Sequence, residues 1–275
     1  MSKNKVCIFC NRTYPEVKMS KEHIIRKKFR KLLGLGGIAH HWEQKIVNQS
    51  TGSIEPLEKR IPQSPYETTL NKVCKECNES WLNDIENNVE HLLVSLALNN
   101  QEIRGTIEDS KSLALWSYKT SVIKAKADTI FNPIPESYYL WVKDKQEPAP
   151  YTFIYLFKCE SAPDNFFIRN LPHTVSLGNH HQFDCHQTTI LLGKMLIYVL
   201  GFNKEVIAES VIDVIENKIT PNSYVRVWPN PNAINWSFLP MHALEELPYL
   251  TTLFCSGPQE NERLIELVRQ WKSKS

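Results

Sequence analysis

The clearest periodic pattern in the chain lies between positions 79 and 98. Apolar side chains recur there at steps of three and four residues, namely Trp81, Ile85, Val89, Leu92 and Leu96. This spacing places them on one face of an α-helix. We therefore predict a helix from position 79 to about 98 that buries this face, with Asn87 pointing away from it.

The residues before this helix show weaker patterns. Positions 21–33 are rich in basic residues and predict a short helix or the start of one. Positions 34–70 contain Gly-Leu-Gly-Gly, Asn-Gln-Ser-Thr-Gly-Ser and prolines, which are turn-forming residues. This stretch therefore predicts loops and short strands.

A polar connector at positions 99–111 divides the chain into two predicted domains, residues 1–100 and residues 110–275. The rear domain shows both kinds of pattern, so we predict an α+β fold class. Its expected helices cover 112–126, 188–200, 204–217 and 260–272, and its expected strands cover 138–142 and 151–157.

Composition and charge narrow the picture. With 42% hydrophobic residues, 275 residues can form sizeable cores. The net charge of +2 hides an asymmetry, because positions 1–75 hold fifteen Lys or Arg against six Glu, or +9, which leaves −7 for the rest. A basic front end suits a phosphate polyanion such as DNA, although a solvated lysine-rich surface would give the same count. No apolar signal region or membrane-length stretch is evident, so we expect a cytoplasmic protein without membrane contact.

Four of the seven cysteines form two Cys-x-x-Cys pairs, Cys7 with Cys10 and Cys74 with Cys77. One short turn of this spacing presents two thiolates to a single tetrahedral ion, so the two pairs predict a structural zinc site. The alternatives are two unrelated thiol pairs or a redox-active pair. A closed four-sulfur site has no open coordination position, so this zinc would stabilise the fold without taking part in chemistry.

Further polar residues stand in a fixed order around the cysteines. Glu22-His23-Ile24-Ile25 lies between the two pairs, Asn78 follows Cys77 directly, and Asn87 comes nine residues later. A histidine beside a glutamate is by itself usually an ordinary polar residue. The whole order, over residues 7 to about 90, closely resembles the HNH endonuclease family in its zinc-ribbon-bearing branch.

The resemblance implies a ββα-metal fold and a role for each matching residue. His23 would be the general base that takes a proton from the attacking water, and Asn78 would hold the loop that bears His23. Glu22 and Asn87 would bind a catalytic divalent ion, Mg²⁺ or Mn²⁺. The chain departs from the commoner pattern in having Glu22 where Asp is frequent. The neighbours Glu86 and His91 are alternatives to Asn87 as the helix ligand, in that order.

A basic run follows the histidine directly and consists of Arg26, Lys27, Lys28, Arg30 and Lys31. Such side chains could hold the phosphates that flank a cleavage site, without reading base sequence. The alternative is a solvated helix face. Further along, Cys185 and four histidines lie within fourteen residues, but their spacing fits no tetrahedral site. We interpret these as ordinary loop residues: His173, His180, His181 and His186.

Taken together, these features predict a metal-dependent HNH endonuclease that cuts or nicks double-stranded DNA, in a setting such as bacterial restriction or phage defence. The first alternative is a zinc-stabilised module that binds nucleic acid or a partner through a degenerate site, and the second is an RNA-directed nuclease. The rear domain could serve recognition, regulation, partner binding or homo-oligomer formation, and its sequence does not choose among these.

Overall fold

The computed structural model describes residues 5–34, 41–42, 45–47, 54–56, 61–62, 66–99, 103–128, 132–160, 166–177, 181–203, 216 and 222–243. These residues form helices and sheets, so the α+β class is confirmed. None of the helices in these ranges is both long enough and apolar enough to cross a membrane.

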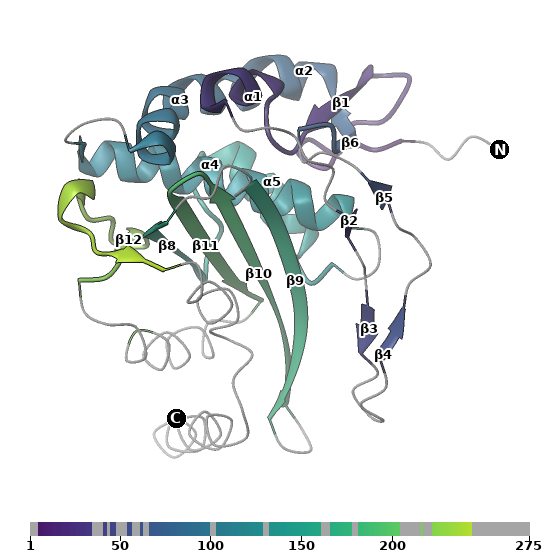
Figure 1. Cartoon of the computed structure of the whole chain (residues 1–275). Coiled ribbons are helices and arrows are strands. Elements are labelled where there is room, and N and C mark those ends of the chain that lie inside the picture. Colours follow the sequence, from purple (N-terminus) through teal and green to yellow (C-terminus); the bar gives the residue numbers. More distant parts are fainter. Residues whose placement is uncertain are drawn as a thin grey trace.

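The front part contains two long-range paired strands, four very short strands and a series of helices (Figure 1). In chain order they are β1 (Met19–His23), α1 (Lys27–Leu33), β2 (His41–Trp42), β3 (Lys45–Val47), β4 (Ile54–Pro56), β5 (Ile61–Pro62), β6 (Thr69–Cys74), α2 (Lys75–Cys77), the π-type turn η1 (Asn78–Leu82) and α3 (Asn83–Leu98).

The rear part contains two further helices and the main sheet. Its elements are β7 (Arg104–Gly105), α4 (Ile107–Ala127), α5 (Glu136–Lys145), β8 (Thr152–Cys159), β9 (Phe166–Leu177), β10 (His181–Leu192), β11 (Met195–Phe202), β12 (Val225–Trp228), β13 (Ile234–Asn235), the 3₁₀ turn η2 (Trp236–Phe238) and β14 (Met241–His242).

Two antiparallel strands followed by a helix organise the front part. β1 pairs with β6, and the chain runs from β6 directly through α2 and η1 into α3. The helix predicted over 79–98 is confirmed from Asn83 to Leu98, with Ile85 and Val89 buried and Asn87 exposed, whereas the π-type turn before it has a non-helical backbone at Ser80. The basic helix begins only at Lys27, because residues 21–23 belong to β1 and residues 24–26 connect the strand to the helix.

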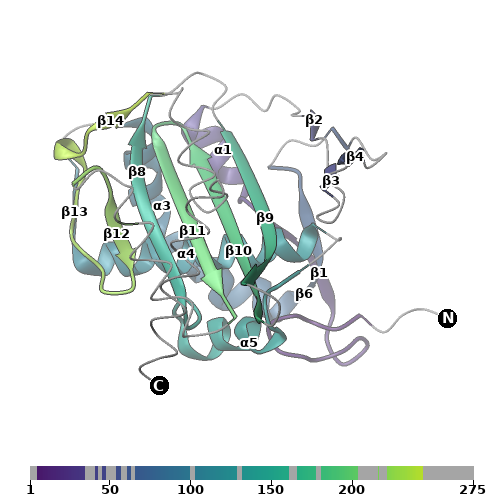
Figure 2. The ribbon, with the colours of Figure 1, turned by 90° about the horizontal axis from the view of Figure 1, so that it is seen from below.

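The main sheet has the order β12-β8-β11-β10-β9, with β14 added parallel to β8. Helices α4 and α5 lie against one face of it, and α1 and α3 lie beyond α4 (Figures 1 and 2). All eight positions of β8 and of β11 are buried. The sheet is therefore the base on which the helical layers rest.

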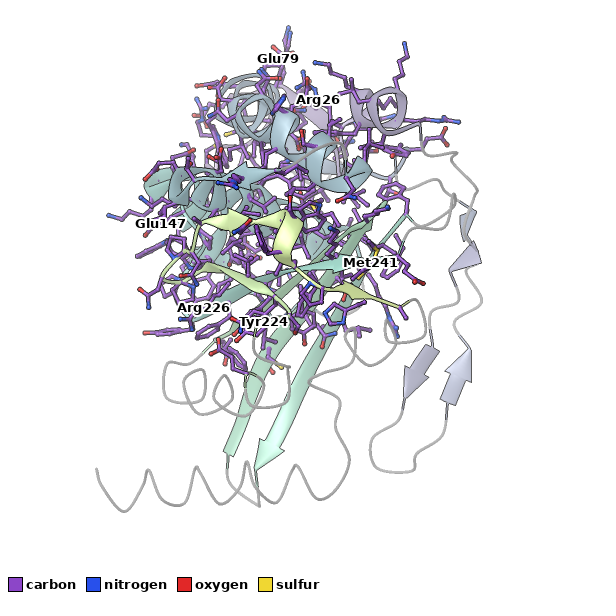
Figure 3. The ribbon with its side chains drawn as sticks, turned by 60° about the vertical axis from the view of Figure 1, so that its left-hand side comes forward. Arg26, Glu79, Glu147, Tyr224, Arg226 and Met241 are labelled. Atoms are coloured by element: carbon purple, nitrogen blue, oxygen red, sulfur yellow. The ribbon has the colours of Figure 1, made fainter. Side chains whose placement is uncertain are left out.

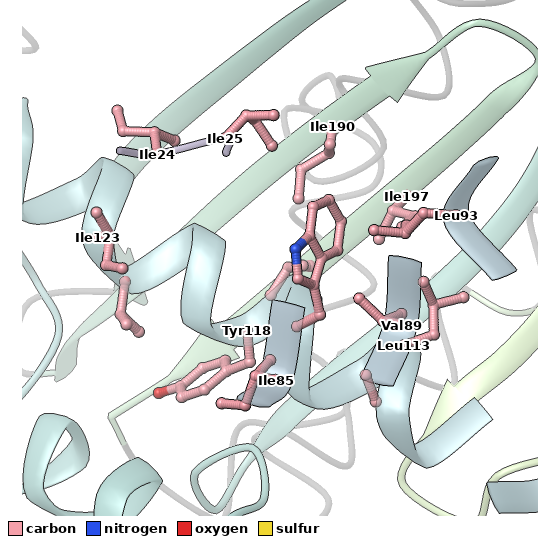
Figure 4. Packing of buried hydrophobic residues seen from close by; sticks show 14 of the residues in the cluster. Ile24, Ile25, Ile85, Val89, Leu93, Leu113, Tyr118, Ile123, Ile190 and Ile197 are labelled. Carbon is pink, nitrogen blue, oxygen red and sulfur yellow. The ribbon is translucent and has the colours of Figure 1, made fainter. Parts of the chain in front are cut away.

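One hydrophobic cluster runs through both parts of the chain. Val89 and Leu93 of α3 and Leu113 of α4 are packed near Ile190 and Ile197 of the sheet (Figure 4). The turn between β10 and β11 also touches α3, because the backbone N–H of Lys194 donates to the carbonyl of Ala97 over 2.9 Å. The two-domain division stays a prediction, and the described parts share one core.

Two segments of the rear part differ from expectation. Residues 138–142 are helical within α5, where Tyr139 and Val142 are buried three positions apart, so the strand prediction is wrong. The predicted helix at 188–200 is wrong too, because this run forms β10 and β11 around a two-residue turn. Gly193 occupies that turn with φ +55°, and a Cβ there would lie 2.4 Å from the Ala97 carbonyl oxygen. Short apolar runs such as those on either side of Gly193-Lys194 fit buried strands as well as a buried helix.

The other rear predictions have mixed outcomes. Helix 112–126 and strand 151–157 are confirmed by α4 and β8. His173, His181 and His186 lie in β9 and β10 rather than in loops. The helices expected at 260–272 and, apart from position 216, at 204–217 lie outside the described residues, as does His180.

Candidate functional site

The first cysteine pair lies on a tight turn. The backbone N–H of Cys7 donates to Arg12 and that of Asn11 donates back to Cys7, both over 2.9 Å. Asn11 adopts φ +55°, a left-handed conformation that asparagine tolerates better than most residues. A further bond from the Ile8 N–H to the Lys72 carbonyl places this turn beside β6.

The second pair joins the end of β6 to α2, and it completes a cluster with the first. Cys74 caps α2 by accepting from the N–H of Cys77 at 3.4 Å, and its own N–H donates to the Cys7 sulfur at 3.3 Å. All four Sγ atoms lie within 4.8 Å of one another. This four-cysteine site could hold one metal ion, and it is the only such group of three or more ligands among the described residues.

Of the sulfurs with a shifted pKa, that of Cys7 is set up to carry negative charge, whereas burial raises the pKa of Cys74 and the hydrogen bond to Cys7 raises the pKa of Cys77. Hydrogen bonding from the Cys77 thiol, helped by backbone N–H groups, outweighs burial and lowers the pKa of Cys7 to about 4. An aromatic contact joins the two cysteine pairs' neighbourhoods, because Phe9, between Cys7 and Cys10, packs edge-on against Trp81 with ring centroids 5.1 Å apart. The sequence prediction that these four residues converge is therefore confirmed.

His23 is the last residue of β1, opposite Thr69 of β6. Between Ser20 and Glu22 the pairing shifts, since β6 uses three steps where β1 uses two. Such a bulge turns the following side chains relative to a regular strand. His23 is half-buried, and burial, together with the charges of Lys27 and Lys119, lowers its pKa below 6.5. The neutral imidazole, which can accept a proton, is thus its form at pH 7.

Asn78 links the start of the helical segment to the strand that bears His23. Its Nδ2 donates to the Oγ of Ser20 at 2.9 Å, and that hydroxyl donates to the Val73 carbonyl at 3.2 Å. The contact therefore ties η1 to both strands of the hairpin. A role in positioning His23 stays a prediction, and the bond to β1 supports it.

Glu22 is buried and faces the rear part of the chain. Its carboxylate lies 3.1 Å from the Nζ of Lys119, a residue of α4 whose side chain is fully buried. Lys119 also donates to Glu86 of α3. Burial raises the pKa of Glu22 against the opposing charge of Lys119, whereas in Lys119 the two carboxylates outweigh burial and raise the pKa. We call Glu22, Glu86 and Lys119, two carboxylates around one ammonium, the acidic triad.

Asn87, the first choice for the helix ligand, lies on the exposed side of α3. Its Oδ1 accepts a hydrogen bond of 2.6 Å from the Arg26 guanidinium. Glu86 is the neighbour that reaches Glu22 through Lys119, while His91 is exposed. Because Glu22 and Asn87 each have an oxygen bonded to a cationic side chain, they do not fit a divalent ion as arranged. Their role as ligands of Mg²⁺ or Mn²⁺ stays a prediction.

The basic run is divided between two environments. Lys28 pairs with Glu90 of α3 at 2.6 Å, and Arg26 is held by Asn87, beside α3 on the helical side of the molecule (Figure 3). Lys27, Arg30 and Lys31 are exposed on α1, with no ion-pair partner within the described ranges. These three are therefore free to meet a polyanion from solution, as far as the described residues are concerned.

Sequence reasoning missed Lys119. It is the only charged residue between Lys111 and Lys124 of α4, surrounded by apolar and small side chains. A lone charge in such a run indicates a buried partner of opposite sign. That signal could have identified Lys119, although not the partners it binds.

Comparisons with protein-family models, with curated proteins and with solved structures each found no significant match to this chain.

Proposed function

We propose that the protein is an endonuclease of the HNH type that hydrolyses phosphodiester bonds in DNA. The observation that supports this best is the arrangement around His23. The histidine ends the first strand of an antiparallel pair, the second strand leads directly into a helix, and Asn78 at the start of that helical segment bonds back to the first strand. This arrangement agrees with the ββα order that the sequence resemblance implies.

We further propose that the ion in the four-cysteine site is zinc. Tetrahedral Zn²⁺ with Zn–S bonds of about 2.3 Å requires sulfurs about 3.8 Å apart. Cys10 and Cys74 have their Sγ atoms 3.8 Å apart. Four sulfur ligands without a carboxylate also suit Zn²⁺ better than Mg²⁺ or Ca²⁺.

In the proposed reaction His23 takes a proton from the water whose oxygen attacks the scissile phosphorus. The bond from phosphorus to the leaving sugar oxygen breaks, and that oxygen takes up a proton from solvent. A neutral imidazole at the edge of the hairpin is in the correct protonation state for this step. Lys27 is exposed and lies four residues after His23, so we assign its ammonium to holding a phosphate beside the base. No step is assigned to a divalent ion, because Glu22 and Asn87 are bonded to Lys119 and Arg26.

A plasmid-cleavage assay tests the proposal. Zinc-loaded protein is incubated with supercoiled plasmid, with and without Mg²⁺ or Mn²⁺, and nicked and linear products are measured. His23→Ala should lower the rate by about 100-fold or more, the usual contribution of a general base. Asn88→Ala, an exposed change on α3, is the matched control and should cut like the wild type. Cleavage that survives His23→Ala would refute the mechanism.

The choice between DNA and RNA needs a separate arm of the assay. Labelled single-stranded RNA and double-stranded DNA of equal length are offered together at the same concentration. The proposal expects preferential cleavage of DNA. Preferential loss of the RNA would favour the RNA-directed alternative, since the same base could attack either backbone.

A second candidate function is supported by the contacts of Glu22 and Asn87. Their bonds to cationic side chains are the arrangement expected of a zinc-stabilised module that binds nucleic acid through a degenerate site. Such a module would bind DNA without cutting it, and the affinity would fall steeply with salt. Fluorescence anisotropy measures DNA binding by the wild type and by Lys27→Ala, and cleavage of the same DNA is measured in parallel. Binding without cleavage would favour the binding module, whereas cleavage would favour the endonuclease.

A further inference from the structure

The acidic triad joins three elements from both parts of the chain. Glu22 comes from β1, Glu86 from α3 and Lys119 from α4. The side chain of Lys119 has no exposed surface, and those of Glu22 and Glu86 are only 9% and 6% exposed. The single ammonium lies within ion-pair distance of both carboxylates.

The charges of the triad do not balance. Two carboxylates share one ammonium, so the group carries a net charge of −1 when all three are ionised. One carboxylate oxygen, Oε2 of Glu86, is buried without a hydrogen-bond partner. An anionic cluster in a buried environment attracts a cation strongly, because water does not screen it. A cation is therefore attracted to the position beside Glu22 and Glu86.

Lys119 occupies that position through the fold itself. α4 packs against α3 and against the sheet, so the backbone that bears Lys119 is fixed on both sides. Moving the ammonium away would leave two buried carboxylates without a counter-charge, which is strongly unfavourable. An ion arriving from solution would have to displace a cation that is covalently part of the chain.

We propose that Lys119 is the resident cation of the Glu22–Glu86 pair and takes the place of a divalent metal ion there. Lys119 is a positioning residue, since it holds both carboxylates in place and binds no substrate. Removal of its charge converts the pair into a divalent-ion site. This inference does not depend on the proposed endonuclease activity.

Mn²⁺ binding, measured by electron paramagnetic resonance on zinc-loaded protein, tests the proposal. The variants are Glu86→Gln, Lys119→Met and Lys119→Met with Glu86→Gln. Lys111→Met, which removes an exposed lysine from the same helix, is the matched control. Lys119→Met should bind one Mn²⁺ at least about tenfold more tightly than the wild type, because a competing positive charge is gone. The added Glu86→Gln change should abolish this gain.

The wild type gives an independent result if Lys119→Met does not fold. Mn²⁺ binding by the wild type should be unchanged by Glu86→Gln, since the Lys119 ammonium already occupies the position beside that carboxylate. A wild-type chain that binds one Mn²⁺ and loses it on Glu86→Gln would overturn the proposal. A folded Lys119→Met variant that gains no Mn²⁺ would also overturn it. Neither measurement uses DNA cleavage, so failure here is distinct from failure of the proposed function.

Discussion

The described residues contain two clusters of groups that can carry negative charge, and the clusters differ in where a counter-charge can come from. Four sulfurs converge at one end of the β1–β6 hairpin, arranged as an ion requires. Glu22 and Glu86 converge farther along the same hairpin and helix, but on a lysine of the chain. The first cluster could hold an ion taken from solution, whereas the second already holds a cation that belongs to the polypeptide. Convergence of anionic side chains alone therefore does not identify a metal site.

The largest expected effect comes from removing one ligand of the sulfur cluster. Cys74→Ser, or treatment with a strong chelator, should unfold the front part of the chain, because structural zinc contributes on the order of 10 kcal/mol to small sites. Circular dichroism and metal analysis measure the loss of structure and of one ion per chain. Cys159→Ala removes a buried thiol outside the site and should keep the ion. Full stability of metal-free protein would show that the sulfur cluster, too, needs nothing from solution.

The next effect concerns the acidic triad. Lys119→Ala should lower the free energy of unfolding by about 3–5 kcal/mol, the usual cost of leaving a buried charge without its partner. Combining it with Glu22→Gln and Glu86→Gln should recover much of this loss, since the remaining groups are neutral. Urea denaturation of the single and triple variants measures both values. Equal stability of the two would mean that Lys119 contributes through packing rather than charge.

A buried titratable group that has no counter-charge among the described residues extends the comparison. His186 of β10 stacks over Gly201 of β11, and burial lowers its pKa to about 3. The unfolded chain, with a pKa near 6.5, binds more protons between pH 6.5 and 3, so stability falls as pH falls through that window. Relative to His186→Leu, the wild type should lose about 1.4 kcal/mol per pH unit there. Thermal denaturation from pH 6.5 to 4 measures this difference, and parallel curves would contradict it.

The smallest change in stability is expected from breaking the exposed hydrogen bond between Arg26 and Asn87. Arg26→Ala breaks the bond to Asn87 on the exposed side of α3 and should cost less than about 1 kcal/mol. Asn88→Ala is the control, because that residue is exposed on the same helix. The same denaturation experiment measures both. A loss comparable to that of Lys119→Ala would place the Arg26–Asn87 contact among the structural interactions of the site.

Local spacing in the sequence was sufficient for some of these features. The two Cys-x-x-Cys pairs predicted the sulfur cluster, because each short turn fixes two ligands wherever it lies. The three- and four-residue steps of Ile85 and Val89 predicted α3, since an amphipathic helix buries the same face in any fold. Prediction of the hairpin at 188–200 failed because apolar runs as short as 190–192 and 195–200 have no period that separates strand from helix, and because the Gly193-Lys194 turn between them was not recognised.

The sequence by itself determined the four sulfur ligands, the helix that follows them, and the position of His23 between the two pairs. Only the tertiary structure decided which partner each buried carboxylate has. Glu22 and Glu86 lie 64 residues apart, and Lys119 lies a further 33 residues along the chain. The packing of α4 between α3 and the sheet brings the three together. An ion pair depends on distances in space, and these arise only when the helices and strands pack.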